Sequence, residues 1–100
     1  MSKLVATKRF LKDIEKFQTH PLMRKKIAQT LKHLERDPRH PGLHLEKIVN
    51  DPTAWSVRLD RRYRLSLEPE NFLESGTPEW SGNILLLRVL DHDDLYQSPH

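Results

Sequence analysis

The fold is decided by residues 55–67, which read Trp-Ser-Val-Arg-Leu-Asp-Arg-Arg-Tyr-Arg-Leu-Ser-Leu. Apolar and polar residues alternate over 55–59 and again over 63–67, which is typical of two half-buried β-strands. The large apolar residues share one face only if an odd number of residues connects the strands, because a one-residue slip exchanges the faces of a strand. The connection Asp60–Arg62 meets this condition. The sequence therefore predicts a β-hairpin with a buried face made by Trp55, Val57, Leu59, Tyr63, Leu65 and Leu67.

This register places Arg58 directly opposite Arg64 on the other, polar face of the hairpin. Like charges in opposed positions destabilise a pair of strands, so the two guanidinium groups need compensation. One source is a phosphate held between two guanidinium forks, which bind phosphate in a bidentate manner. The alternative is that both side chains turn into water or pair with Glu46, Glu68 or the acidic tail. From the polar face we also expect that loss of Arg64 removes little packing.

Upstream of the hairpin the sequence predicts a strand followed by two helices. Leu4–Ala6 is a short apolar strand, and Thr7 is a suitable N-cap for a helix from Lys8 to about Gln18. A second helix begins at Pro21, because proline is tolerated in the first turn, and ends near Asp37. The apolar residues of both helices recur at helical spacing and predict core contacts: Phe10, Ile14, Phe17, Met23, Ile27, Leu31 and Leu34.

Around and beyond the hairpin the sequence is extended. Residues 43–48 form a short strand or a linking segment, and residues 69–82 form a long acidic loop with two prolines and two glycines. Residues 84–90 are apolar on both faces, as in a central strand that is covered on each side, and a short polar tail follows. The predicted fold is α+β, with an N-terminal strand and a two-helix hairpin on one face of an antiparallel-rich sheet of about four strands. Residues 1–100 are expected to form a single domain.

Composition narrows the classes of function. The chain has 100 residues, 36% of them hydrophobic, and no apolar window long enough to span a membrane, so we expect a cytoplasmic protein without a membrane partner. It has no cysteine, which excludes a disulfide framework, a thiol nucleophile and a cysteine zinc site. Residues 1–66 carry sixteen Lys and Arg against seven Asp and Glu, whereas residues 67–100 carry one against seven. The basic part favours a polyanion such as nucleic acid, and the alternative is a solvated helical surface.

One histidine stands out as a candidate for chemistry. His92 directly follows the most apolar predicted strand, and an imidazole suits proton transfer near neutral pH. The alternative is a surface histidine in a turn. The chain contains no His-Glu-x-x-His motif, and the spacing of the other histidines does not predict a metal site, so we expect neither a metal nor a cofactor.

Taken together, the order of elements, the segment Trp55–Leu59 followed by Tyr63–Leu65, and the turn His92–Tyr96 after the last strand resemble the RelE/ParE toxin superfamily. The Trp-Ser-x-Arg and Arg-Leu motifs are closest to the YoeB-like branch, and the ending of His followed four residues later by an aromatic is similar to YafQ-like members. The resemblance covers nearly the whole chain. It implies the α+β fold described above.

The resemblance also implies an activity. Such toxins of type II toxin–antitoxin systems enter the ribosome and cut messenger RNA without a metal, because the 2′-hydroxyl attacks the adjacent phosphate. By resemblance, Arg64 stabilises the phosphorane, and Arg58 does the same or holds a flanking phosphate. His92 is the proton donor or acceptor, Tyr96 stacks or forms a hydrogen bond, and Glu46 is the candidate base. Further contacts to the RNA backbone are expected from Lys47, Arg61 and Arg62.

The partners that the resemblance implies are a cognate antitoxin, mRNA on the ribosome, and operator DNA only through the antitoxin complex. The alternative function comes from the ParE-like side of the superfamily. A member of that kind is directed at gyrase, or binds only its antitoxin without catalysing a reaction.

Overall fold

The hairpin forms at the predicted register. In the computed structural model, which describes residues 2–100, Trp55 pairs with Leu67, Val57 with Leu65, and Arg58 with Arg64. The turn between the strands is held by one side chain, because the Asp60 carboxylate accepts hydrogen bonds from the backbone N–H groups of Arg62 (2.8 Å) and Tyr63 (2.7 Å). This use of aspartate to fix a tight turn is common, and it explains why the odd-numbered connection is stable.

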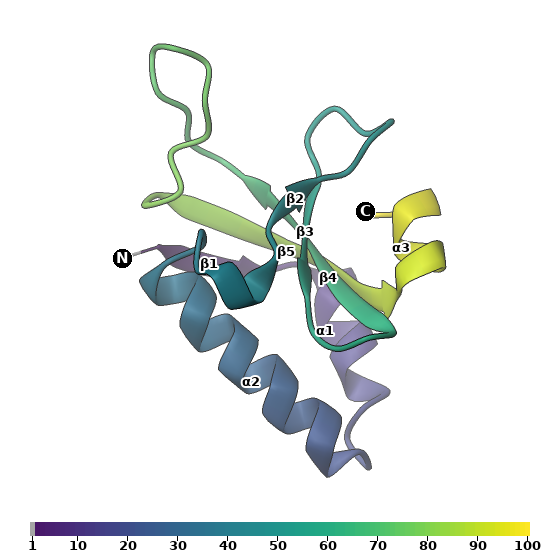
Figure 1. The fold of residues 1–100 in the computed structure, drawn as a ribbon. Coiled ribbons are helices and arrows are strands. Elements are labelled where there is room, and N and C mark those ends of the chain that lie inside the picture. The colour runs from purple at the N-terminus through teal and green to yellow at the C-terminus, as the bar shows by residue number, and fades with distance from the viewer. Residues whose placement is uncertain (1) are drawn as a thin grey trace.

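The hairpin belongs to a five-stranded sheet of order β1-β5-β4-β3-β2, in which β1 is parallel to β5 and the other pairs are antiparallel (Figure 1). The strands are β1 (Lys3–Ala6), β2 (Glu46–Lys47), β3 (Trp55–Arg58), β4 (Tyr63–Pro69) and β5 (Asn83–Asp91). The helices are α1 (Lys8–Glu15), α2 (Pro21–Arg36), the 3-10 turn η1 (Pro41–Leu43) and α3 (His92–Gln97). The predicted fold class is confirmed, and the undecided segment 43–48 contributes the end of η1 and the short strand β2.

The two predicted helices begin where their capping residues allow. Thr7 Oγ1 accepts the backbone N–H of Phe10 (3.2 Å) and so caps α1, and Pro21 occupies the first turn of α2. Helix α1 ends at Glu15, earlier than predicted, and residues 16–19 continue as turns. The buried side chains of both helices pack with the apolar face of the hairpin and with β5 in one core: Phe10, Met23, Ile27, Leu34, Leu43, Val57, Leu59, Leu65, Leu67, Trp80, Ile84, Leu86 and Val89.

Strand β5 is covered on both faces, as its sequence predicts. A register shift at Ser66/Leu67 of β4 skips Leu87 of β5. Leu87 then lies in a second core on the opposite face of the sheet, together with Ile48, Ala54 and Leu95. Burial of both faces accounts for the continuous apolar run in this strand.

Beyond the residues of β5 that pair with β1, a side chain of α1 accepts a hydrogen bond from the backbone of β5. Strand β1 pairs only as far as Leu86. Past that point the buried Asp13 accepts the backbone N–H of Val89 (2.9 Å) and forms two hydrogen bonds with the Arg88 guanidinium (2.7 and 3.1 Å). The carboxylate thus replaces a missing strand partner and ties α1 to β5.

The prediction of a short polar tail after β5 is wrong. Residues 92–97 form helix α3 on the face of the sheet opposite α1 and α2. The polar face of the hairpin is therefore covered. Ser56 and Ser66 are fully buried, and Ser66 Oγ donates to the carbonyl of Pro99 (2.6 Å) just after α3.

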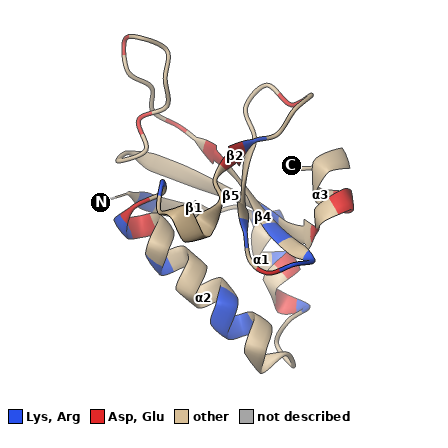
Figure 2. Cartoon of the chain, in the orientation of Figure 1, with Lys and Arg blue, Asp and Glu red and all other residues tan. Residues whose placement is uncertain are grey.

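The acidic loop lies away from this helix. Residues 70–82 join β4 to β5 and are narrowed by a bridge between Phe72 and Pro78. Figure 1 shows the loop projecting from the end of β5 remote from α3. In Figure 2 acidic positions mark this loop, whereas basic positions mark α2 and the hairpin, as the charge distribution of the sequence indicates. Within residues 2–100 no helix is long and apolar enough to cross a membrane.

We predict that Asp13→Ala lowers the free energy of unfolding by about 3 kcal/mol, because it leaves the Arg88 guanidinium and the Val89 N–H without their partner. Asp13→Asn, which keeps one acceptor oxygen, should lose less. Urea denaturation monitored by tryptophan fluorescence measures both variants, with the exposed neighbour Glu15→Gln as control. A loss below about 1 kcal/mol in Asp13→Ala would contradict the bridging role.

Candidate active site

Helix α3 is fixed to the turn of the hairpin by its first residues. The Asp91 carboxylate caps the helix by accepting the Asp93 N–H (3.0 Å), and its other oxygen pairs with Arg62 Nε (3.1 Å). The His92 N–H donates to the Arg62 carbonyl (2.8 Å). The Asp93 N–H and then Arg62 hold the pKa of Asp91 below its ordinary value. One oxygen of the Asp91 carboxylate therefore bonds to the first turn of α3, and the other bonds to Arg62 in the turn of the hairpin.

This anchorage gives His92 and Tyr96 a defined arrangement. They are one helical turn apart, and their rings stack with centroids 4.4 Å apart at 19°. Leu95 between them is buried in the second core, which fixes the orientation of the helix. The His92 side chain stays half exposed, with Nδ1 3.4 Å from Asp93 Oδ1, so one imidazole edge is accessible from solvent.

Tyr96 joins Arg64, Ser56 and Glu46 in a ring of polar contacts, which we call the Arg64 cluster. Arg64 Nε donates to Ser56 Oγ (3.1 Å), and Ser56 Oγ lies 3.0 Å from the Tyr96 hydroxyl. The Tyr96 hydroxyl donates to Glu46 Oε1, and the same oxygen lies 3.8 Å from Arg64 Nη2. A second hydrogen bond from Arg64 Nη2 to the His44 carbonyl (3.1 Å) completes the support of the guanidinium.

The direction of the hydrogen bonds in the Arg64 cluster follows from proton counting. The Tyr96 proton is given to Glu46, so Ser56 donates to the Tyr96 oxygen and accepts from Arg64. Burial raises the pKa of the Tyr96 hydroxyl, and the hydrogen bond to Glu46 raises it further, while Ser56 and Arg64 act in the opposite direction and are outweighed. Tyr96 is consequently neutral at ordinary pH and acts as a donor that orients the Glu46 carboxylate.

The cluster unites four of the predicted site residues: Glu46, Arg64, Tyr96 and, by stacking on Tyr96, His92. The Arg64 side chain is only 12% exposed, so the expectation that its loss removes little packing is wrong. The cause is α3, which covers the face on which Arg64 lies.

Arg58 does not join the Arg64 cluster. Its Nε donates to the Asp60 carbonyl (3.3 Å), and its side chain lines a pocket against α2 and η1. The two opposed arginines therefore diverge. Glu46 lies beside Arg64, which is one of the pairings expected as the alternative to a phosphate held between the two arginines. In this structure the pair is not arranged as one clamp.

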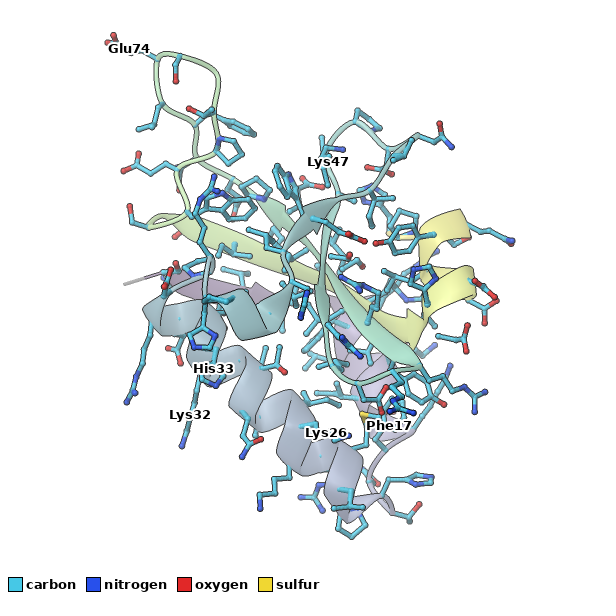
Figure 3. The ribbon with its side chains drawn as sticks, viewed as in Figure 1. Phe17, Lys26, Lys32, His33, Lys47 and Glu74 are labelled. Atoms are coloured by element: carbon cyan, nitrogen blue, oxygen red, sulfur yellow. The ribbon has the colours of Figure 1, made fainter. Side chains whose placement is uncertain are left out.

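The three predicted backbone-contact residues lie around the cluster without entering it. Lys47 Nζ donates to the carbonyls of Ile48 (3.2 Å) and Asp51 in the loop after β2. Arg62 pairs with Asp91, and its guanidinium lies 5.2 Å from the centre of the Tyr63 ring. Arg61 is exposed in the hairpin turn. Figure 3 labels Lys47 at the upper edge of the sheet.

Two contributors to the cluster were missed by sequence reasoning. The signal for Ser56 was its place in the alternation, which puts it on the same face as Arg64. His44 contributes through its carbonyl, which is aimed at Arg64 by a left-handed backbone conformation (φ 49°, ψ 52°). Positive φ at a residue other than glycine is uncommon and favours functional or tightly held positions. Nothing in the sequence around His44 predicts this role of its carbonyl.

Within residues 2–100 no group of three or more His, Asp or Glu side chains is gathered to hold a metal ion.

Comparison with known proteins identifies the fold. No protein-family model matches the sequence, and no curated protein matches it. Among solved structures, a YoeB/ParE toxin from Agrobacterium tumefaciens has a TM-score of 0.70 and 22% identity, covering 90% of this chain and 98% of that one. YafQ from E. coli has a TM-score of 0.68 and 10% identity, covering 95% and 98%. A RelB–RelE antitoxin–toxin complex from Methanococcus jannaschii has a TM-score of 0.56 and 22% identity, covering 93% and 95%. The chain has the fold of the RelE/ParE toxins, which confirms at the level of the fold the resemblance inferred from the sequence.

The ring of hydrogen bonds makes a prediction about the Tyr96 hydroxyl. Ser56→Ala removes a donor to the phenolic oxygen and should raise the pKa of Tyr96 still further, whereas Glu46→Gln removes an anionic acceptor and should lower it toward the ordinary value of about 10. Alkaline titration of tyrosine absorbance measures both changes, with Tyr63 as the internal reference. Shifts of the same sign in the two variants would contradict the assigned direction of the hydrogen bonds.

Proposed function

We propose that this chain is the toxin of a type II toxin–antitoxin system and cleaves messenger RNA on the ribosome. The observation that carries the proposal is the Arg64 cluster, in which a guanidinium, a carboxylate and a neutral phenol converge beside an accessible imidazole. The shared fold and the basic surface of α2 and the hairpin support it. The reaction is attack of a 2′-hydroxyl on the adjacent phosphate, which forms a 2′,3′-cyclic phosphate and expels the 5′-oxygen as a hydroxyl.

Arg64 is assigned to the phosphorane. Its Nε donates to Ser56 Oγ and its Nη2 donates to the His44 carbonyl. These two hydrogen bonds fix the plane of the guanidinium before substrate binds. A preorganised cation stabilises developing negative charge without having to reorient during the reaction. The remaining N–H groups of the fork are suited to two phosphate oxygens.

Glu46 is assigned to the 2′-hydroxyl proton. Its side chain is about half exposed (52%), and Tyr96 and Arg64 both lie beside Oε1. The second carboxylate oxygen is then the one that accepts the proton from the attacking hydroxyl. Tyr96 acts as a positioning residue, because its hydroxyl holds Glu46 while its ring supports His92.

His92 is assigned to the leaving 5′-oxygen. Its half-exposed ring stacks on the Tyr96 ring, whereas Glu46 is held at the Tyr96 hydroxyl, so we assign the acid and the base to different sides of the phosphate. A protonated imidazole donates to the departing oxygen as the P–O bond breaks, and the neutral imidazole is later reprotonated from water. Backbone phosphates on either side of the cut are assigned to Lys47, Arg61 and Arg62, and an RNA phosphate outside the Arg64 cluster is assigned to Arg58.

The proposed partner is an antitoxin segment with acidic and apolar side chains that covers the basic face, and the complex contacts operator DNA through the antitoxin. Charge complementarity to α2 and the hairpin supports this partner, as does the shared fold with RelE of the RelB–RelE antitoxin–toxin complex. We further propose that the protein acts in the cytoplasm, because its proposed substrate is messenger RNA on the ribosome.

The function is tested by adding the purified protein to a reconstituted translation reaction and mapping message ends by primer extension. Discrete cuts that require ribosomes are expected. Normal translation combined with inhibition of purified gyrase would contradict the proposal and favour the ParE-like alternative.

We predict that Arg64→Lys and Arg64→Gln both lose cleavage by about 100-fold or more, because neither reproduces the fixed fork of donors. Since Arg64 is largely buried and supports Ser56, the variants should also be less stable by about 1 to 2 kcal/mol. Cleavage is measured by primer extension and stability by thermal melts. A folded Arg64→Gln variant that cuts at the normal rate would show that the cluster is structural.

We predict that His92→Gln slows cleavage by about 100-fold to 10,000-fold and leaves ribosome binding nearly unchanged, because only the proton-transfer step is lost. Single-turnover cleavage and cosedimentation with ribosomes separate the two effects. His20→Gln, an exposed histidine at the start of α2, serves as the matched control and should behave as wild type. Equal losses of rate and affinity in His92→Gln would assign it to binding instead.

A further inference from the structure

A second cationic site lies on the other side of the hairpin from the Arg64 cluster. It is a pocket of about 140 Å³ between α2, η1 and the edge of β3. Cationic and imidazole side chains reach it from all three segments: Lys26 and His33 from α2, His40 from the start of η1, and Arg58 from β3. No acidic side chain is among the residues that line it, and we call it the Arg58 pocket.

The folding of the chain explains why these groups meet. Lys26, Thr30 and His33 recur at helical spacing and follow one side of α2, with Thr30 buried against the core (Figure 3 labels Lys26 and His33). Strand β2 pairs only with Trp55 and Ser56, so β3 is an edge at Arg58 and its side chain has room to turn toward α2.

Arg58 is held in a way that leaves it donors for a ligand. Its Nε donates to the Asp60 carbonyl (3.3 Å), and among residues 2–100 its two Nη atoms have no hydrogen bond to protein. Asp60 Oδ2 lies 3.9 Å from Lys26 Nζ, and Asp60 Oδ1 accepts two backbone N–H groups of the turn. The fixed fork of Arg58 thus faces the pocket with its terminal donors available.

The two histidines add a second, independent feature. Their rings stack with centroids 4.7 Å apart at 27°. His40 Nδ1 accepts the Gly42 N–H (3.1 Å), which places the ring proton of His40 on Nε2 as a donor. His40 thus adds an N–H donor to the cationic side chains that line the pocket.

We propose that the Arg58 pocket binds a phosphate group of an RNA backbone, as an anion site distinct from the Arg64 cluster. The phosphate class follows from the donors, namely a guanidinium fork, an ammonium, imidazole N–H groups and the Thr30 hydroxyl. The choice of RNA as its source rests on the proposed function. Continuity supports it, since the adjoining surface hollow is lined by His40, Arg39 and also His44, the residue whose carbonyl holds Arg64. A strand crossing η1 would reach both sites.

Binding is tested directly by NMR on the full chain. Inorganic phosphate, and then a 12-nucleotide single-stranded RNA, are titrated while the side-chain resonances of Arg58, His33 and His40 are followed. We expect the resonances of all three residues to shift with the same dissociation constant. In the double variant Lys26→Gln/Arg58→Gln the affinity for the RNA should fall about tenfold, and the slope of log K against log salt should decrease by about 0.7 for the lost phosphate contact. The control is Lys25→Gln/Lys32→Gln, which removes the same charge from exposed positions of α2 outside the pocket.

The source of the phosphate is found by comparing affinity for the RNA strand with affinity for purified small ribosomal subunits. A selective loss with the strand identifies message, and a selective loss with the subunits identifies ribosomal RNA. Equal behaviour of the test and control variants in both assays, or phosphate shifts confined to the Arg64 cluster, would overturn the proposal. Failure of the proposed function is distinguishable, because the wild-type chain would then show the phosphate-induced shifts without cutting message.

Discussion

The structure depends on the carboxylate of Asp60, which accepts two backbone N–H groups and so fixes a three-residue turn between β3 and β4. The odd number of residues sets the register, and the register decides which side chains face which side of the sheet. One face then carries Val57, Leu65 and Leu67 into the main core, and the other carries Ser56, Arg64 and Ser66 toward α3. A slip by one residue would bury arginine in the apolar core and expose leucine, so the candidate site and the core are specified together.

Helix α3 converts that second face from a solvated surface into an ordered site. Its Asp91 cap is tied to the hairpin turn through Arg62, and Leu95 anchors it to the sheet, so Tyr96 meets Ser56 and Glu46. The repulsion expected between Arg58 and Arg64 is resolved by divergence. Arg64 turns to Ser56, the His44 carbonyl and Glu46, and Arg58 turns to the far edge of β3. Two separate cationic sites result from one opposed pair.

Much of the fold could be predicted because its signals are local. Alternation at 55–67, the cap at Thr7, the proline at the start of α2 and the apolar run at 84–90 each depend on a few adjacent residues. Helix α3 was missed because its six residues contain a single buried apolar side chain and show no helical period, and the cap at Asp91 was the remaining signal. The burial of Arg64 and the role of the His44 carbonyl could not be predicted, because both arise from contacts between residues distant in sequence. Among the candidate residues, resemblance singled out Glu46 and Tyr96, and the geometry joins them to Arg64.

Attack by the 2′-hydroxyl is tested most directly by the chemistry of the cut. A message carrying a single 2′-deoxynucleotide at a mapped cleavage site is compared with the unmodified message, and the fragment ends are identified by mass spectrometry. We expect 2′,3′-cyclic phosphate and 5′-hydroxyl ends from the unmodified message and no cut at the modified position. Cleavage of the deoxy-substituted message, or fragments ending in 3′-hydroxyl and 5′-phosphate, would contradict attack by the 2′-hydroxyl and with it the roles given to Glu46, Arg64 and His92.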